Sequence, residues 1–326
     1  MIFRHVPFIT SCALMLILAV AALCHAGAKE ISLLGGAMST ANDQEGSYSW
    51  QLKYLEELDD HFSASLSYLN EGHVPVHHRD GHTLQLWGHT NLLNRCLSLA
   101  AGIGPYYYYD TVANADGTYT NNHGWKAVAT LAATWHTESR WLFQVSSNWV
   151  AAGASIDTMS AMAGIGYQLD PPQAAGTVDT EPPDLEKTPA NEVTVFLGRT
   201  VVNSFNSEHS VATGVEYRRS LCRYLDATLE WLYEGDTRLV RREGLAAQLW
   251  GVREFFNDRL ALGVGVGAYA ALDHYNGNSD FLSTIFTLTG SYRFHPHWAT
   301  RASWNRIGTN DSRDTDVILG GIGYLF

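Results

Sequence analysis

Five histidines lie close together in the sequence, where their spacing would suit a metal ion. His73, His77, His78 and His82 fall in one short stretch, and His89 follows shortly after it. Imidazole nitrogen is a common ligand of zinc. The alternative is a solvated loop in which these side chains contact only water.

Three pairs of charged residues recur at a constant separation along the chain. Each pair is 163 positions apart (234 − 71 = 163): Glu71 and Glu234, Arg79 and Arg242, Asp80 and Glu243. Opposite charges at the ends of adjacent strands can form an ion pair, whereas charges that face a lumen can line a pore and select what passes. These six residues are therefore the candidate functional charges, and both interpretations stay open.

The charged pairs belong to a tandem repeat that fills most of the chain. The unit begins at Gly35 and Gly198, and its end repeats with a separation of 157 (321 − 164 = 157). The matched segments are 68–72 with 231–235, 85–88 with 248–251, 102–104 with 265–267, and 164–167 with 321–324. The histidines are not repeated, since the second copy has at their positions Asp236, Val240, Arg241, Leu245 and Val252. We therefore expect a solvated loop there, with no metal ion and no cofactor.

Each copy is predicted to contain eight strands. The segments alternate between apolar and polar residues over about ten positions, the length of a tilted strand that crosses a membrane. In the first copy the predicted strands are 30–39, 47–55, 62–71, 81–90, 95–110, 125–136, 140–150 and 156–169. The chain is 46% hydrophobic but has no long apolar run after its N-terminus, which excludes a helical membrane protein.

The connections between these strands alternate in length. Short turns lie at 59–60, 93–94 and 137–138, whereas longer polar loops lie at 41–46, 72–80, 112–124, 203–208, 235–242 and 274–280. Outer-membrane barrels have short periplasmic turns and long extracellular loops. The alternating segment 317–326, which ends at Phe326, resembles the C-terminal strand of such barrels. We therefore predict an all-β transmembrane barrel in the outer membrane of a Gram-negative bacterium.

The N-terminus has the layout of a secretory signal peptide. Arg4 precedes an apolar run at 12–23 and small residues at 26–28, and this run is too short to span a bilayer. We predict a signal peptide over 1–28, the first eight-strand repeat over 29–170, a flexible proline-rich periplasmic linker over 171–191, and the second repeat over 192–326. Only Cys96 and Cys222 remain after the signal, so at most one disulfide is expected. The net charge of −12 argues against nucleic acid as a partner.

The middle of each copy is similar to a known enzyme family. The segments 231–236, 244–250 and 260–269 resemble the middle strands of the small eight-stranded lipid A 3-O-deacylase barrels. The resemblance implies ester hydrolysis by a serine that a histidine activates, in the pattern His-x-Ser-Asn. Segment 145–148 reads Val-Ser-Ser-Asn and segment 302–305 reads Ala-Ser-Trp-Asn, so both copies lack the histidine. We therefore expect no deacylase activity, no catalytic residue, and an ordinary wall position for Ser147.

Two sets of aromatic residues offer a surface for sugars. They are Tyr106 to Tyr109 in one run, and Trp87 with its counterpart Trp250. Aromatic rings can stack on sugars, but the commoner use of such residues is a girdle at the membrane interface.

Two eight-strand units can close separately or share one wall. We favour a single antiparallel barrel of about 16 strands built from the two tandem repeats, because that strand count matches the porin size class. Two separate eight-stranded barrels are the alternative, and the linker has the reach for either.

A lumen of sixteen strands would be wide enough for polar solutes. The sequence thus predicts a pore or export channel, with surface polysaccharide as a candidate cargo. The alternatives are a lipid A-modifying hydrolase-like barrel and a non-catalytic structural surface barrel. The expected partners are outer-membrane lipid, the barrel assembly machinery and, for export, a periplasmic partner.

Overall fold

A computed structural model describes residues 28–41, 45–151, 156–170, 191–275 and 281–326. Almost all of the predicted signal peptide and nearly all of the predicted linker lie outside these residues. Among the described residues, no helix has the length and apolar character needed to cross a bilayer. All regular structure within the described ranges is strand, which confirms the predicted all-β class and its sixteen strands in two units of eight.

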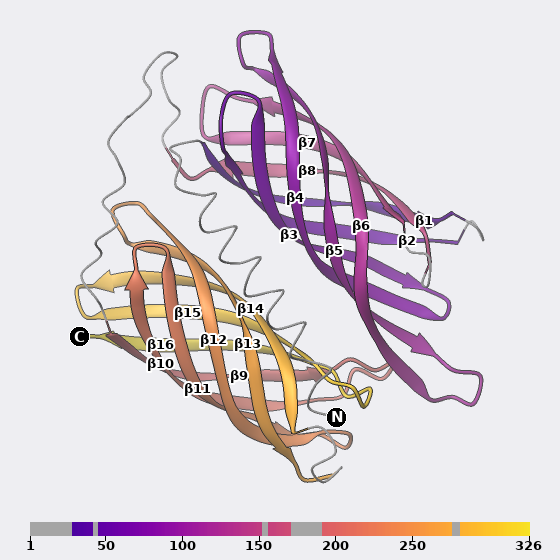
Figure 1. Cartoon of the computed structure of the whole chain (residues 1–326), viewed down its shortest axis with the longest axis vertical. Helices are drawn as coiled ribbons and strands as arrows, with labels where there is room; N and C mark the ends of the chain where they lie inside the picture. The colour runs from indigo at the N-terminus through magenta and orange to yellow at the C-terminus, as the bar shows by residue number, and fades with distance from the viewer. Residues whose placement is uncertain (1–27, 42–44, 152–155, 171–190, 276–280) are drawn as a thin grey trace. The chain divides into compact units, whose positions relative to one another are not determined.

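The first unit is a closed antiparallel barrel of eight strands (Figure 1). Each strand pairs with its neighbour in sequence, and the last strand pairs with the first through Glu30↔Gln168 to Thr40↔Thr158. The strands are β1 Lys29–Thr40, β2 Gly46–Glu57, β3 Phe62–Val74, β4 His77–Leu92, β5 Leu97–Ala113, β6 Tyr119–His136, β7 Trp141–Ala151 and β8 Thr158–Gln168.

The second unit repeats this architecture. Its closure runs from Thr315↔Val202 to Leu325↔Glu192. Its strands are β9 Asn191–Val202, β10 His209–Cys222, β11 Leu225–Asp236, β12 Arg241–Phe255, β13 Leu260–Asp273, β14 Leu282–His295, β15 Trp298–Gly308 and β16 Thr315–Leu325. Cys96 and Cys222 both carry free thiols.

The prediction of one sixteen-stranded barrel is wrong, and the alternative of two separate barrels is the observed fold. A shared wall would pair β8 with β9, but β8 pairs with β1 and β16 pairs with β9. Closing each unit on itself pairs the edge strands of that unit with each other. No strand pairing then has to bridge the long linker. Alternation along a strand does not reveal which strand will cover its edge, so the sequence pattern allowed both outcomes.

At both closing seams, a glycine in the first strand of the unit lies too close to the last strand to carry a side chain. A Cβ on Gly36 would lie 2.0 Å from the Ala161 carbonyl oxygen, and a Cβ on Gly198 would lie 1.9 Å from that of Ile318. Gly36, not Gly35, is therefore the structural equivalent of Gly198. The glycine match at the start of the repeat was out of register by one residue.

The two faces of each wall differ in chemistry. Side chains alternate between lumen and exterior along every strand. Outward positions carry large exposed apolar residues, such as Ile103, Leu131 and Trp149 in the first barrel and Val195 and Leu197 in the second. Many inward positions carry buried serine, threonine, glutamine and charged side chains. An apolar exterior around a polar interior is the arrangement of a barrel that faces lipid.

Two of the long loops predicted in the first copy are instead strand. β3 and β4 are joined by only Pro75 and Val76, so the predicted loop at 72–80 is wrong, and β5 and β6 occupy much of 112–124. The ladder continues there through His77↔Val112 and Asp80↔Tyr109. Backbone pairing does not depend on apolar side chains, so polar segments can extend a sheet. The five histidines therefore lie on strands.

Engineered disulfides can test the closure of the first barrel. Leu33 and Ile165 are direct partners on β1 and β8, with backbones close enough for a disulfide, so L33C/I165C should cross-link within one chain on mild oxidation. Cys96 and Cys222 are replaced by serine in the background, and the bond is detected by gel mobility and peptide mass analysis.

Val195 provides the matched control. It pairs with Ile322 in β16, so V195C/I322C should also cross-link. The pair I165C/V195C joins β8 to β9 and would form only across the seam of a sixteen-stranded barrel. Efficient cross-linking of that pair, with none in L33C/I165C, would contradict two closures.

Candidate functional site

A buried ion pair crosses the interior of the first barrel. The Arg79 guanidinium donates to the Glu71 carboxylate through Nε (2.6 Å) and Nη2 (2.9 Å), and these side chains are only 1% and 2% exposed. Arg79 also donates to Thr158 Oγ1 at 2.8 Å, and the Tyr106 hydroxyl donates to Glu71 at 2.9 Å. The Thr158 hydroxyl donates to the same carboxylate. Residues from β3, β4, β5 and β8 are thus joined across the lumen.

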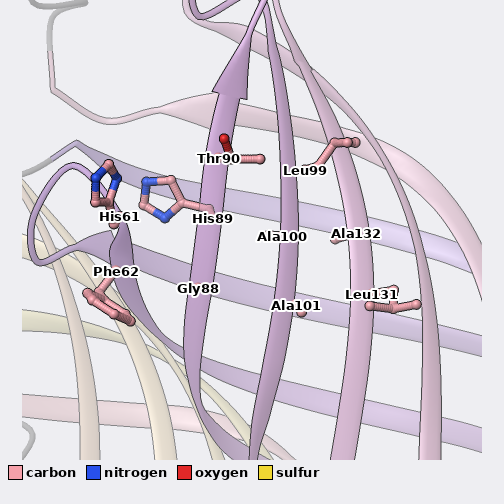
Figure 2. Close-up of a pocket in the computed structure, with 10 residues that line it drawn as sticks. All are labelled: His61, Phe62, Gly88, His89, Thr90, Leu99, Ala100, Ala101, Leu131 and Ala132. Carbon is pink, nitrogen blue, oxygen red and sulfur yellow. The ribbon is translucent and has the colours of Figure 1, made fainter.

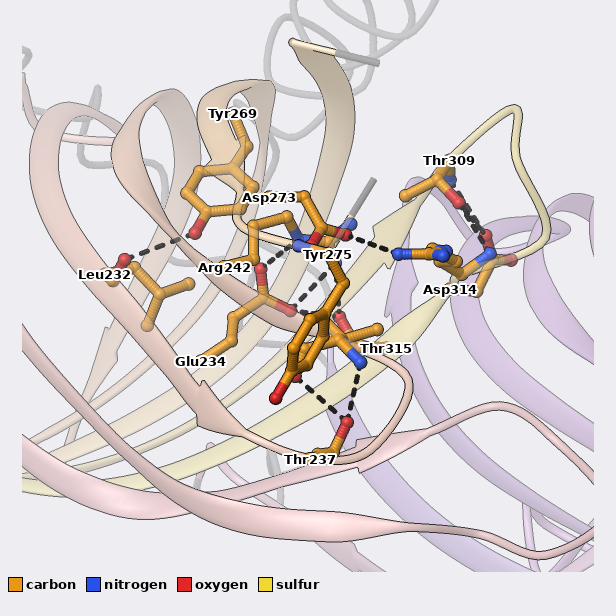
Figure 3. Close-up of polar contacts among 12 residues, drawn as sticks. Leu232, Glu234, Thr237, Arg242, Tyr269, Asp273, Tyr275, Thr309, Asp314 and Thr315 are labelled. Carbon is orange, nitrogen blue, oxygen red and sulfur yellow. Dashed lines mark hydrogen bonds and ion pairs between the residues drawn. The ribbon is translucent and has the colours of Figure 1, made fainter. Parts of the chain in front are cut away.

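The second barrel contains the same arrangement (Figure 3). Arg242 donates to Glu234 through Nε (2.5 Å) and Nη2 (2.8 Å), and to Thr315 Oγ1 at 3.0 Å. Thr315 donates to Glu234 at 2.6 Å. Tyr269 differs from its counterpart because its hydroxyl donates to the Leu232 carbonyl oxygen, at 3.2 Å. Four of the six predicted charges therefore form two closed ion pairs.

A bulge lies at each luminal glutamate. Gly72 and Gly235 directly follow the glutamates with φ values of +67° and +84°, a region that favours glycine. The register of β3 against β4 shifts between Asn70 and His73, and that of β11 shifts at the same place. The repeated Glu-Gly dipeptide thus marks the position of the bulge opposite each arginine.

The other two predicted charges do not join the ion pairs. Asp80 and Glu243 are the next residues along β4 and β12, so they point to the opposite face of the wall. Asp80 is buried on that face and pairs in register with Tyr109. Glu243 is half-exposed, with an oxygen 3.8 Å from His274 Nε2.

Tyr106 and Thr158 are functional partners that the sequence reasoning did not identify. Both are repeated in the second copy, as Tyr269 at a separation of 163 (269 − 106 = 163) and as Thr315 at 157 (315 − 158 = 157). Their repetition was a usable signal. The sequence did not reveal that residues on four strands would meet at one level of the lumen.

A tryptophan fills the next level of each lumen. Trp87 and Trp250 are 2% and 1% exposed, and their indole N–H groups donate to Ser65 Oγ at 2.8 Å and Thr228 Oγ1 at 2.9 Å. The rings lie on glycine: a Cβ on Gly102 would come within 2.5 Å of Trp87, and one on Gly265 within 2.6 Å of Trp250. The expectation of an interfacial girdle or sugar platform is wrong for these tryptophans, since both lie inside.

The tyrosine run is divided between the two faces. Tyr106 and Tyr108 are buried toward the lumen. Tyr107 points outward and contacts Trp125, with ring centroids 4.9 Å apart. Strand geometry alone separates neighbours in this way, so the run cannot form one continuous stacking surface.

A third repeated set contains the asparagine of the deacylase-like segment. Gln85 donates to Thr130 at 2.9 Å, and Thr130 donates to Asn148 Oδ1 at 2.8 Å. The corresponding distances among Gln248, Thr287 and Asn305 are 2.9 and 2.7 Å. The asparagine side chain in each copy thus points into the lumen and accepts a hydrogen bond there.

The serines of the deacylase-like segments lie on both faces of the wall. Ser147 is the register partner of Leu131 and Ala161, so it lies on the outward face of the wall. Ser303 is buried, with its hydroxyl 3.1 Å from that of Thr289. Ser303 corresponds to Ser146 (303 − 157 = 146), and the position of Ser147 is occupied by Trp304 in the second copy, so the serine of the His-x-Ser-Asn pattern is not repeated.

Below the tryptophan the two lumens differ. In the first barrel Lys53 donates to Gln144 at 2.7 Å. In the second barrel Arg301 forms ion pairs with Glu192, at 2.9 Å, and with Glu216. Both arrangements fill the interior with mutually bonded polar side chains.

The five histidines point to different faces and do not converge. His77 Nδ1 lies 2.9 Å from Asp110, whereas His73 and His78 stack with ring centroids 3.9 Å apart. His82 packs against Tyr68 on the outer face. Within the described parts of the chain, no group of three or more histidine, cysteine, aspartate or glutamate side chains is arranged to hold a metal ion.

Comparisons with known proteins reveal likeness in fold alone. No protein-family model and no curated protein matches this chain. The N-terminal β-barrel domain of Pseudomonas aeruginosa OprF is 17% identical, covering 44% of this chain and 98% of that domain, with a TM-score of 0.37. Neisserial surface protein A is 8% identical over 44% of this chain and 97% of its own, with a TM-score of 0.35. The CymD monoaromatic hydrocarbon channel is 8% identical over 95% and 91%, with a TM-score of 0.24.

Removing one partner of the luminal ion pair should destabilise its barrel strongly. E71Q leaves the Arg79 guanidinium buried without an anion, a loss of about 3–5 kcal/mol in the free energy of unfolding. E234Q should have the same effect on the second barrel. Urea unfolding of the purified protein in detergent, followed by tryptophan fluorescence, measures both changes.

The exposed pair Asp60 and Arg95 provides the control. It joins two turns at the barrel end, and its side chains are 80% and 64% exposed. D60N should therefore change stability far less than E71Q. Equal effects of D60N and E71Q would contradict a structural role for the buried pair.

Proposed function

We propose that this protein is an outer-membrane protein of two tandem barrels that acts as a membrane-embedded surface scaffold and not as a wide pore. The apolar exterior of both units supports membrane embedding. Strand lengths of 11 to 18 residues exceed the roughly ten needed to cross the bilayer, so the longer strands would extend beyond it.

The observation that carries this proposal is the filled interior of each barrel. An eight-stranded barrel has an interior just wide enough for its own side chains. In both units the Glu–Arg pair and the tryptophan below it occupy successive levels, joined by hydrogen bonds to several strands. A wide passage would require these side chains to leave together.

The hypothesis of polysaccharide export depended on a sixteen-stranded lumen. Two closed eight-stranded units offer no interior of that width, so export through the barrel loses its geometric basis. A narrow channel for small polar solutes is the second candidate, because polar side chains line both interiors. The periplasmic partner was expected for export, so neither of these two candidates calls for it.

The orientation follows from the ends of the barrels. The ends of β1, β8, β9 and β16 that carry the unit termini would lie on the periplasmic side, with the short turns. The barrel assembly machinery would then recognise β16 and Phe326 from that side.

Planar-bilayer recording distinguishes the two candidates. We expect no conductance steps of porin size from the purified protein, because the side chains in each lumen form a closed network. Small steps that grow in E71A/E234A would favour the narrow channel. Large, stable steps from the wild-type protein would overturn the scaffold proposal.

Lipid A analysis tests the hydrolase alternative. Mass spectra of lipid A from cells with and without the protein should be identical, since Ser147 lies on the outward wall and the sequence has Val145 where the resemblance requires a histidine. Loss of an acyl chain that depends on the protein, and that S147A abolishes, would contradict this expectation.

A further inference from the structure

The outer wall of the first barrel has an apolar depression of about 600 Å³ near the end that carries the termini. Its floor is formed by Gly88 and Ala101, which are direct register partners on β4 and β5. A Cβ placed on Gly88 would meet nothing within 4 Å. Phe62 and Leu131 lie on opposite sides of this floor (Figure 2). Two small residues between large ones therefore leave a depression at this place in the wall.

Large apolar side chains form the walls of the groove. Phe62, Leu99 and Leu131 are 50%, 42% and 67% exposed. The depression is shallow and open to the outside, so it can take a chain that lies along the wall but does not enclose a ligand. The apolar lining fits a hydrocarbon chain.

Charged residues of both signs lie on the two turns at this end of the groove. His61, in the turn between β2 and β3, lines the depression itself. Its neighbour Asp60 forms an ion pair with Arg95 in the turn between β4 and β5, at 3.1 Å. Asp59 accepts hydrogen bonds from the backbone N–H groups of His61 and Phe62, which hold the pKa of its carboxyl below the usual range. The turns therefore present fixed negative charge beside a guanidinium.

The second barrel lacks the small residue at the floor. Gly251 pairs with Val264 at the equivalent place, and Leu225 stands where the first barrel has Phe62. Valine carries two methyl groups on its Cβ atom, whereas the side chain of Ala101 ends at Cβ. The duplicated unit can therefore form without this groove, so the groove is a feature of the first copy.

We propose that this groove binds one acyl chain of a zwitterionic phospholipid from the periplasmic leaflet, with the head group at the turns that carry Asp60 and Arg95. This inference rests on the proposed membrane location. The phosphate of such a lipid complements Arg95 and His61, and its ammonium group complements Asp59 and Asp60. A purely anionic head group brings no ammonium group to complement Asp59, which disfavours it.

Native mass spectrometry of the full mature protein tests the proposal. The protein is released from detergent after incubation with phosphatidylethanolamine or with anionic phosphatidylglycerol, and the bound lipids are counted. We expect the wild-type protein to retain one more phosphatidylethanolamine than A101L, which fills the floor of the groove. A101V, which copies the residue of the second barrel, should give an intermediate loss without disturbing the fold.

The matched control is V264L in the second barrel. It enlarges an equivalent outward side chain where there is no groove, so its lipid count should equal that of the wild type. The double variant D60N/R95Q should lower the preference for phosphatidylethanolamine over phosphatidylglycerol by about two- to fivefold, the effect expected of an exposed ion pair.

Two outcomes would overturn the lipid site. One is an equal lipid count in wild type, A101L and A101V, and the other is a wild-type preference for phosphatidylglycerol. Membrane fractionation of the same strains distinguishes failure of the lipid site from failure of the proposed function. A wild-type protein that is absent from the outer-membrane fraction defeats the membrane location itself, whereas normal insertion with unchanged lipid binding defeats only the groove.

Discussion

The buried ion pair between a glutamate and an arginine organises the interior of both barrels. Each carboxylate accepts from the guanidinium and from a threonine on the closing strand, and in the first barrel also from Tyr106. A charge held away from water is tolerated only when its hydrogen-bonding capacity is met. The pair therefore constrains which strands can surround it, and it ties the closing strand to the rest of the wall.

Closure of each unit follows the same logic. Thr158 and Thr315 belong to the strands that complete the two barrels, so the luminal network and the closing seam depend on each other. In an interior as narrow as eight strands provide, polar side chains from opposite walls reach one another directly. In the wider lumen of a sixteen-stranded barrel, side chains on opposite walls would be too far apart to form hydrogen bonds. The duplicated network is thus compatible with two barrels and not with one, which moves the functional proposal from a wide pore to a filled scaffold.

Much of the local structure was predictable from short segments of sequence. Alternation located all eight strands of the first copy, and the constant separation of 163 selected Glu71 with Glu234 and Arg79 with Arg242 among the candidate charges. The extension of β3 to β6 beyond the apolar segments was not predictable, because His77 and Asp80 look like loop residues until their partners Val112 and Tyr109 are known. The inward position of Trp87 was also missed, since an aromatic residue suits a lumen or an interface equally well.

The sequence by itself determined the class of fold and the duplication, and it narrowed the luminal ion pairs to six repeated charges, because periodicity and recurring residues are local features of the chain. Only the tertiary structure decided that the chain closes twice, that Ser147 faces outward while Asn148 faces the lumen, and that Gly88 and Ala101 meet to form a groove. These features depend on which strand lies beside which. That choice is made by long-range pairing and by packing inside the barrel, which no single segment of sequence contains.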